Sequence, residues 1–302
     1  MTGTHGAPNR RDFVRGGVTV AAIGLSCGSA EAAPRDATRL KRGPFFVEVD
    51  DIRMYCEVQG RGPLLILLNG MWLESFTNHF GKAFRDELAR HFTVLTFDAR
   101  GQGRTSAGNG PITYGRFASD AVGLMDKLQI EKAHFVGHSD GGTIQLYLLI
   151  DFPDRVSSST LVGTSYSQDS YYPEVREFFS GWFDALKKGS VPDASGPAVA
   201  KTRADYALQS PHPERFDEML RAMRKCYATE PNISLRQLAM IDRPVLVVKG
   251  GKDKYIPPEQ FSVLANTIPG ARMVSFDAMT HEIEPFIEKI ADAVADFAKP
   301  GG

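Results

Sequence analysis

Cysteine is scarce in this chain of 302 residues, and neither sign of charge is in excess. The three cysteines set no disulfide framework, and pairing of Cys56 with Cys226 stays open. Lys and Arg total 35 against 36 Asp and Glu, which gives no reason to expect a nucleic acid or an anionic membrane as partner. No spacing of His, Cys and Glu residues indicates a metal site, and we expect no cofactor.

The N-terminal segment, residues 1–32, has the features of an export signal. Arg10 and Arg11 lie in a segment that resembles the bacterial twin-arginine motif, and an apolar stretch too short to span a bilayer follows it. Ala30 and Ala32 supply the small residues that signal peptidase requires. We expect cleavage after Ala32, export to the periplasm or medium, and no stable membrane association afterwards. The alternative is a basic N-terminus that carries no signal.

Short apolar runs alternate with helical patterns over most of the remaining chain. The runs that indicate strands are 45–49, 52–58, 64–68, 92–97, 133–136, 159–162, 244–248 and 273–276. The helical patterns are 84–90, 114–128, 143–150, 259–265 and 283–297. Alternating β and α segments predict an α/β fold with a mostly parallel sheet of about eight strands and helices on both faces.

Residues 164–242 break this alternation. They contain no convincing strand, and their aromatic, helical pattern is interrupted by several prolines. An all-helical insertion between two late strands predicts a cap over the carboxyl ends of the strands, where ligands bind in parallel sheets. The expected domains are therefore a signal peptide at 1–32, a core at 33–163 and 243–302, and a helical cap at 164–242.

The decapeptide 133–142 is the most informative part of the sequence, because it has the form strand, Gly-x-Ser-x-Gly, helix. A serine at the tip of a sharp strand-to-helix turn projects its hydroxyl clear of the sheet. Gly137 and Gly141 remove the side chains that would clash in so tight a turn. The following helix points unpaired N–H groups at the site and favours developing negative charge. Ser139 is therefore the candidate nucleophile; the alternative is a glycine-rich turn with a capping serine.

From about residue 45 onward the chain resembles the α/β-hydrolase superfamily of serine hydrolases. Besides the serine turn, residues 98–106 resemble the Asp-x-Arg-Gly-x-Gly-x-Ser segment of that superfamily. The resemblance implies that His281, after the last strand, is the base. Asp253, in the loop after a buried strand, is the expected acid and gives the chain order Ser, Asp, His. Asp169 is the alternative acid.

The oxyanion of an acyl-transfer reaction requires two hydrogen-bond donors. The backbone N–H of Asp140 is the expected first donor, and that of Met71 the expected second. Trp72, His138 and Tyr166 are candidates for the substrate pocket. Packing under the cap is the alternative for Trp72, and packing beside the turn is the alternative for His138.

Together these residues predict hydrolysis through an acyl-enzyme. The expected substrate is a carboxylic ester or lactone of a small to medium, partly apolar molecule, because the insertion is rich in aromatic residues. A carbon–carbon bond hydrolase or a cofactor-free perhydrolase would use the same three residues. A ligand-binding protein of the same fold is the rival of another class. The oligomeric state stays open.

Overall fold

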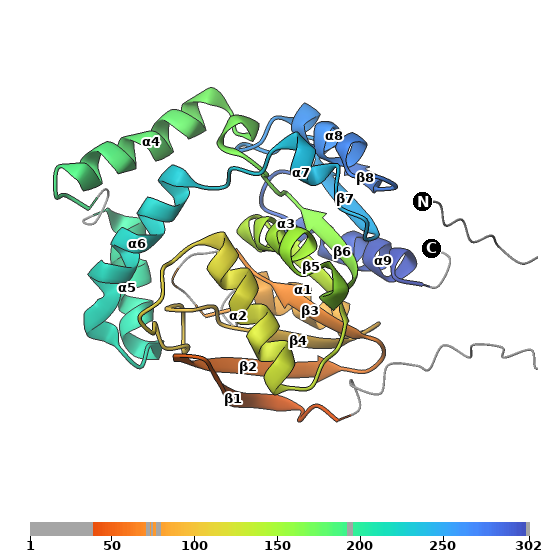
Figure 1. Ribbon diagram of the computed structural model, residues 1–302, viewed down its shortest axis with the longest axis horizontal. Helices are drawn as coiled ribbons and strands as arrows, with labels where there is room; N and C mark the ends of the chain where they lie inside the picture. Colours follow the sequence, from red (N-terminus) through yellow and green to blue (C-terminus); the bar gives the residue numbers. More distant parts are fainter. Residues whose placement is uncertain (1–38, 71–72, 74, 77–79, 192–195, 300–302) are drawn as a thin grey trace, which may run out of the picture. The chain divides into compact units, whose positions relative to one another are not determined.

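The computed structural model describes residues 39–70, 73, 75–76, 80–191 and 196–299. In this part of the chain one sheet of eight strands has the order β1-β2-β4-β3-β5-β6-β7-β8 (Figure 1). The pairs β1–β2 and β2–β4 are antiparallel, and the other five pairs are parallel. The prediction of a mostly parallel sheet of eight strands is confirmed.

The elements follow the predicted alternation. The strands are β1 (Gly43–Val49), β2 (Ile52–Gly60), β3 (Leu64–Leu68), β4 (Thr93–Phe97), β5 (Ala133–His138), β6 (Val156–Val162), β7 (Val245–Gly250) and β8 (Arg272–Phe276). The helices that accompany them are α1 (Phe80–Leu88), α2 (Tyr114–Lys127), α3 (Asp140–Asp151), α8 (Pro258–Thr267) and α9 (Ile287–Phe297).

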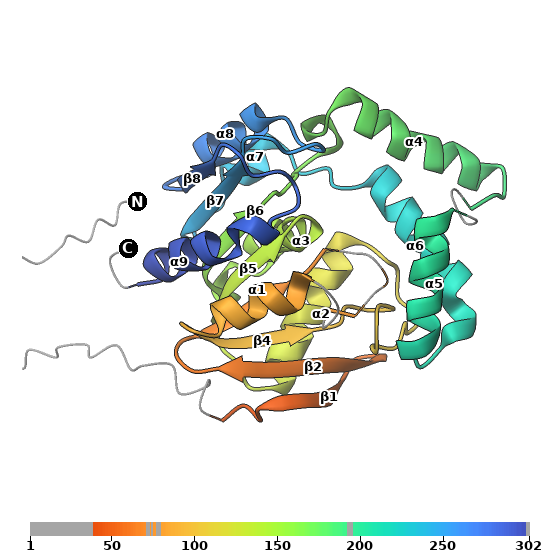
Figure 2. The same cartoon turned by 180° about the vertical axis from the view of Figure 1, so that it is seen from behind.

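Strand β3 is buried along its whole length because helices cover both faces of the sheet. Successive side chains of a strand point to opposite faces, so Ile66 joins the hydrophobic cluster under α2 and α3, whereas Leu65 joins the cluster under α1 and α9. Figure 2 shows α1 and α9 on the face of the sheet opposite α2 and α3. The continuous apolar runs of the sequence are therefore explained by burial on two sides.

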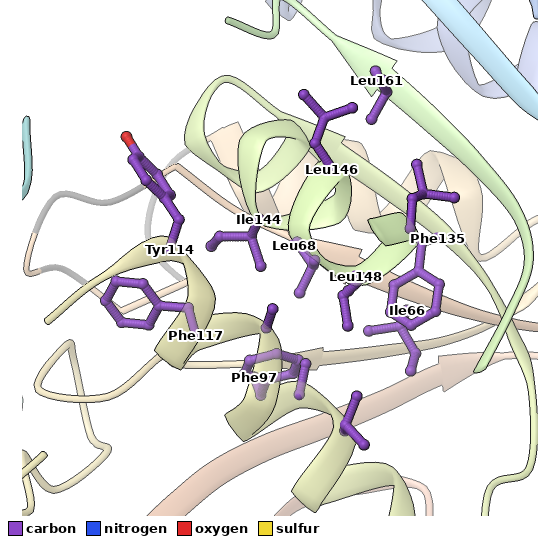
Figure 3. Close-up of a cluster of buried hydrophobic side chains, with 14 of the residues drawn as sticks. Ile66, Leu68, Phe97, Tyr114, Phe117, Phe135, Ile144, Leu146, Leu148 and Leu161 are labelled. Carbon is purple, nitrogen blue, oxygen red and sulfur yellow. The ribbon is translucent and has the colours of Figure 1, made fainter. Parts of the chain in front are cut away.

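Packing of α3 against the sheet fixes the turn that precedes this helix. Figure 3 shows Ile66, Leu68 and Phe135 of the strands together with Ile144 and Leu148 of α3 in one cluster of buried side chains. Burying each such side chain contributes about 1.5–3 kcal/mol. The cluster therefore holds α3, and with it the end of β5, in one position.

The chain between β6 and β7 forms helices and no named strand in its described residues. These helices are α4 (Pro173–Lys187), α5 (Pro197–Gln209), α6 (Phe216–Thr229) and the short α7 (Leu235–Leu238). Helices α4 and α5 both contact α6, and Figure 1 shows the three grouped at one side of the sheet. An isolated bridge between Ser167 and Asn232 joins the two ends of the segment. It therefore leaves and re-enters the core at neighbouring points.

Cys56 and Cys226 are buried free thiols, so the structure does not pair them. None of the helices in the described residues is long and apolar enough to cross a bilayer. The expected signal peptide and its cleavage site after Ala32 lie outside the described residues.

Candidate active site

Ser139 is the single residue between β5 and α3, and its backbone is strained. Its φ of 54° and ψ of −122° are unusual for a residue with a Cβ and cost about 1–3 kcal/mol. The two glycines predicted for this turn are required by close approach. A Cβ on Gly137 would lie 2.4 Å from the carbonyl carbon of Gly141, and a Cβ on Gly141 would lie 2.1 Å from the carbonyl oxygen of Leu68. The turn therefore closes only because both positions lack a side chain.

His281 connects Ser139 with Asp253. Its Nε2 lies 3.0 Å from the Ser139 Oγ, and its Nδ1 lies 2.8 Å from the Asp253 Oδ2. The other carboxylate oxygen of Asp253 accepts the backbone N–H groups of Tyr255 and Ile256 at 2.8 and 3.1 Å. Because a carboxylate accepts at Nδ1, that nitrogen carries the imidazole proton, and Nε2 is left to accept the proton of the serine hydroxyl.

Gly163 lies beside the Asp253–His281 pair. It follows β6 with a φ of 56°, a conformation that favours glycine. A Cβ at this position would lie 3.5 Å from both the Asp253 Oδ2 and the His281 ring. Gly163 is not among the site residues that the sequence predicts, although a glycine directly after a predicted strand is an available signal.

His138 holds the backbone of His281. Its Nε2 lies 2.8 Å from the His281 carbonyl oxygen, and the two rings are 4.9 Å apart between centroids. Burial, together with the neighbouring His281 ring, lowers the pKa of His138 to about 3. The ring is therefore neutral at ordinary pH, and its Nε2 donates the proton to the carbonyl oxygen.

Asp140 directs its carboxylate at two buried tyrosines. Its Oδ1 accepts from the Tyr114 hydroxyl at 2.5 Å, and its Oδ2 accepts from the Tyr227 hydroxyl at 3.0 Å. Burial, reinforced by the Asp140 charge, raises the pKa of both tyrosines well above the ordinary value, so both remain protonated donors. Tyr114 belongs to α2 and Tyr227 to α6. The residue after the serine is thus bonded to the inserted segment.

Ser139 faces a cavity of about 650 Å³. Core residues at its wall include His138, Asp140 and His281, and the inserted segment contributes several aromatic residues. These aromatic residues pack on one another: the rings of Phe179 and Tyr227 are stacked at 14° with centroids 5.7 Å apart. The cavity is therefore polar beside the serine, whereas the insertion contributes mostly aromatic and aliphatic residues to its wall.

A model of the alpha/beta hydrolase fold family matches residues 63–283 of this chain. The chain belongs to this family. The resemblance inferred from the serine turn is thereby confirmed at the level of the superfamily.

Three similar proteins illustrate the range of the family. The dihydrolipoyllysine-residue acetyltransferase component of an acetoin cleaving system from Cupriavidus necator is 30% identical over 70% of this chain, but the match spans only 58% of that protein. A solved hydrolase from Pseudomonas aeruginosa PA01 is 29% identical with a TM-score of 0.65, covering 85% of this chain and 98% of that one. The enol-lactonase from Burkholderia xenovorans LB400 is 25% identical with a TM-score of 0.63, covering 84% and 99%.

Of the residues proposed from the sequence, the structure brings Ser139, Asp253 and His281 together. Asp140 is the first residue of α3, directly after Ser139. Asp169, the alternative acid, has a side chain that is 86% exposed and is paired with Arg176 at 2.6 Å. It is His281 and Asp253, therefore, that form the hydrogen-bonded pair.

Of the pocket residues expected from the sequence, one lines the cavity, one does not, and one lies outside the described residues. His138 lines the cavity, whereas Tyr166 is not among the described residues that line it. Tyr166 is buried, and its hydroxyl donates to the Gln260 side chain at 2.7 Å, which anchors the start of the insertion to α8. Met71 and Trp72 lie outside the described residues.

Within the described residues, no group of three or more His, Cys, Asp or Glu side chains could hold a metal ion.

Proposed function

We propose that this protein is a serine hydrolase that cleaves a carboxylic ester or lactone in a small to medium, partly apolar substrate. The observation that carries the proposal is the hydrogen-bonded series Ser139, His281 and Asp253 at the wall of a cavity of about 650 Å³. A serine hydroxyl becomes nucleophilic when an oriented base accepts its proton. The similarity to an enol-lactonase supports the choice of bond.

The proposed reaction has two steps. Ser139 Oγ attacks the carbonyl carbon while His281 Nε2 takes its proton, and Asp253 stabilises the imidazolium that forms. His281 then gives this proton to the leaving alkoxide, which leaves an acyl-enzyme on Ser139. A water molecule deprotonated by His281 attacks the acyl group, and the serine leaves with the returned proton.

Negative charge develops on the carbonyl oxygen in the transition state, and hydrogen-bond donors held in position stabilise it. The N–H of Asp140 at the start of α3 is the proposed first donor, and that of Met71 is the proposed second. Loss of one such donor costs about 3 kcal/mol of transition-state stabilisation. The helix N-terminus adds a favourable field for the same negative charge.

We also propose that residues 164–242 form a helical cap domain on the core. Support comes from Phe179, Trp182 and Tyr227, which belong to this segment and line the same cavity as Ser139. Their rings suit the apolar part of a substrate. The remaining parts of the proposed division are the core at 33–163 and 243–302 and the signal peptide at 1–32.

The test is covalent labelling of the mature protein with a small fluorophosphonate, followed by peptide mass spectrometry. We expect a single adduct on Ser139, no adduct in His281→Ala, and unchanged labelling in Ser180→Ala, a control at an exposed serine of α4. An adduct at another residue would contradict the site, and absence of labelling would favour a ligand-binding protein. An ester and lactone panel then separates this activity from carbon–carbon bond hydrolysis and perhydrolysis, which would use the same residues.

Export by the twin-arginine route is proposed from the sequence around Arg10 and Arg11. We expect the Arg10→Lys/Arg11→Lys variant to remain in the cytoplasm as uncleaved precursor, whereas wild type is exported and begins at Ala33. Arg39→Lys, outside the signal, serves as the control. Cell fractionation and mass spectrometry of the N-terminus provide the measurement, and equal export of both variants would exclude this route.

A further inference from the structure

Two hydroxyl groups at the cavity wall are bonded to each other. Ser165 Oγ donates to the hydroxyl oxygen of Tyr171 at 2.6 Å, and both residues line the cavity. The carbonyl oxygen of Ser165 accepts from the hydroxyl of Thr143 in α3 at 2.9 Å. Ser165 also lies three positions after Val162, whose carbonyl oxygen accepts the backbone N–H of Ser139 at 2.8 Å. The pair is therefore in the part of the cavity wall that adjoins the serine turn.

The two hydroxyls carry more protons than their mutual bond uses. Each hydroxyl has one proton to donate. Because Ser165 donates to Tyr171, the Tyr171 proton remains, and no hydrogen bond within the described part of the chain takes it. Burial, together with the charge of Asp140, raises the pKa of Tyr171, so the phenol keeps this proton at ordinary pH. The pair therefore offers one donor to a molecule in the cavity.

The Tyr171 side chain is held at both ends. Its ring centroid lies 5.4 Å from that of Phe179 with the planes at 80°, and Phe179 stacks in turn on Tyr227. The hydroxyl end is fixed by the bond from Ser165. A hydroxyl that accepts a hydrogen bond is polarised and becomes a stronger donor. Because this donor is already ordered, little conformational entropy is lost when it binds an acceptor.

The acceptor that suits this donor is a neutral oxygen. Asp140 lines the cavity, and its negative charge acts on the Tyr171 hydroxyl. The same charge repels an anion at this hydroxyl, and the repulsion is weakly screened where water is excluded. A carbonyl oxygen accepts a hydrogen bond without adding a charge.

We infer that the Tyr171 hydroxyl donates a hydrogen bond to a second carbonyl oxygen of the substrate, so that the preferred ester or lactone carries a further uncharged carbonyl group besides the one that Ser139 attacks. Ser165 is a positioning residue that orients the phenol. This inference rests on the proposed function, because it assumes that the cavity receives the substrate of Ser139.

Two pairs of esters test the inference, with the second carbonyl group in the acyl part or in the alcohol part. 4-Nitrophenyl 4-oxopentanoate is compared with 4-nitrophenyl 4-methylpentanoate, and 2-oxopropyl butanoate with 2-methylpropyl butanoate. Each pair exchanges the second carbonyl oxygen for a methyl group. Comparison of the kcat/KM ratio of a pair between variants cancels the difference in intrinsic reactivity. Tyr171→Phe/Ser165→Ala, which removes both hydroxyls, should lower this ratio in at least one pair by about three- to tenfold, as expected for a neutral hydrogen bond.

Single variants identify the donor. Tyr171→Phe should lose more of the ratio than Ser165→Ala, which keeps the phenol proton. Tyr172→Phe makes the same change at the neighbouring residue, which is not among the described residues that line the cavity, and should keep the wild-type ratios. Wild-type ratios for both pairs in the double variant would overturn the inference, and a larger loss in Ser165→Ala than in Tyr171→Phe would overturn the assignment of the donor.

A binding measurement separates this inference from the proposed function. Ser139→Ala, with and without Tyr171→Phe/Ser165→Ala, is titrated with methyl 4-oxopentanoate and with 2-oxopropyl butanoate by nuclear magnetic resonance, which requires no turnover. Binding of at least one ketone that is about threefold or more weaker in the triple variant supports the inference even if no ester is hydrolysed. Methyl 4-methylpentanoate and 2-methylpropyl butanoate should bind both variants equally, which shows that the cavity is intact.

Equal binding of both ketones to the two variants would overturn the inference. Failure of the proposed function would instead appear as absence of ester turnover and of the fluorophosphonate adduct.

Discussion

Tyr227→Phe is expected to destabilise the protein without disturbing the aromatic packing of the insertion. The substitution removes only the hydroxyl that donates to Asp140 at 3.0 Å, and the ring that stacks on Phe179 remains. A hydrogen bond to a charged acceptor contributes about 1.5–3 kcal/mol. We therefore expect the free energy of unfolding to fall by about 2 kcal/mol, which corresponds to a decrease in Tm of about 4–8 °C for a domain of this size.

A double-mutant cycle measures how much of the Tyr227 hydrogen bond depends on the negative charge of Asp140. In an Asp140→Asn background the acceptor is neutral, and a neutral hydrogen bond contributes only about 0.5–1.5 kcal/mol. Tyr227→Phe should then cost about 1 kcal/mol, which leaves a coupling energy of about 1 kcal/mol between the two positions. This coupling energy is the charge-dependent part of the interaction between Tyr227 of α6 and Asp140, the residue that follows Ser139.

Urea unfolding followed by circular dichroism provides the four free energies. Tyr172→Phe is the matched control, because the hydroxyl of this partly exposed residue makes no hydrogen bond in the described part of the chain. We expect it to change the free energy of unfolding by less than about 0.5 kcal/mol. An equal cost of Tyr227→Phe in both backgrounds would refute the assignment of a charged hydrogen bond.

Outcomes are also expected for four further variants. Asp253→Asn should keep the fold but lower kcat by about 10⁴, because the amide no longer holds the imidazole tautomer; a loss of less than about tenfold in ester assays would contradict its role. Gly141→Ala should cost about 3 kcal/mol or more in thermal unfolding, since its Cβ would lie 2.1 Å from a backbone oxygen. Gly181→Ala, where nothing lies within 4 Å of the added Cβ, should instead stabilise α4 slightly. The folded-state pKa of His138, about 3, is below its ordinary 6.5, so the unfolded chain binds more protons between these values and stability rises with pH across that window. His138→Gln should reduce this slope in urea unfolding from pH 4 to 7, and an unchanged slope would exclude the buried neutral ring as its source.

Local sequence predicts those elements whose geometry restricts which residue types can occupy each position. Strand β3 is recognisable because a strand covered on both faces must be apolar at every position. The serine turn is recognisable because its geometry excludes a Cβ at Gly137 and Gly141. The chain order of Ser139, Asp253 and His281 follows from the family resemblance, since nothing local brings Ser139 into contact with His281, which lies 142 positions further along the chain.

Other features depend on long-range packing and leave no local signal. Asp140 is 26 residues from Tyr114 and 87 from Tyr227 in the chain, so neither hydrogen bond can be inferred from spacing. Arg224 has the pattern of an ordinary charge on an amphipathic helix, and its place at the cavity wall beside Trp182 depends on how the inserted helices pack. Tyr166 was expected in the pocket on composition alone, but its hydroxyl bonds to Gln260 instead.

Three consecutive residues of the serine turn bond to two distant parts of the chain, His281 and α6, and these bonds help a strained backbone to persist. His138 donates to the backbone of His281, Ser139 contacts the His281 ring, and Asp140 accepts from Tyr227 of the insertion. Backbone strain of about 1–3 kcal/mol is retained only where the surroundings over-determine the conformation. Because one of these contacts comes from the insertion, the segment that lines the cavity also stabilises the turn that presents the serine. We therefore expect substitution of Tyr227 in α6 to affect the turn that carries Ser139 through its hydrogen bond to Asp140.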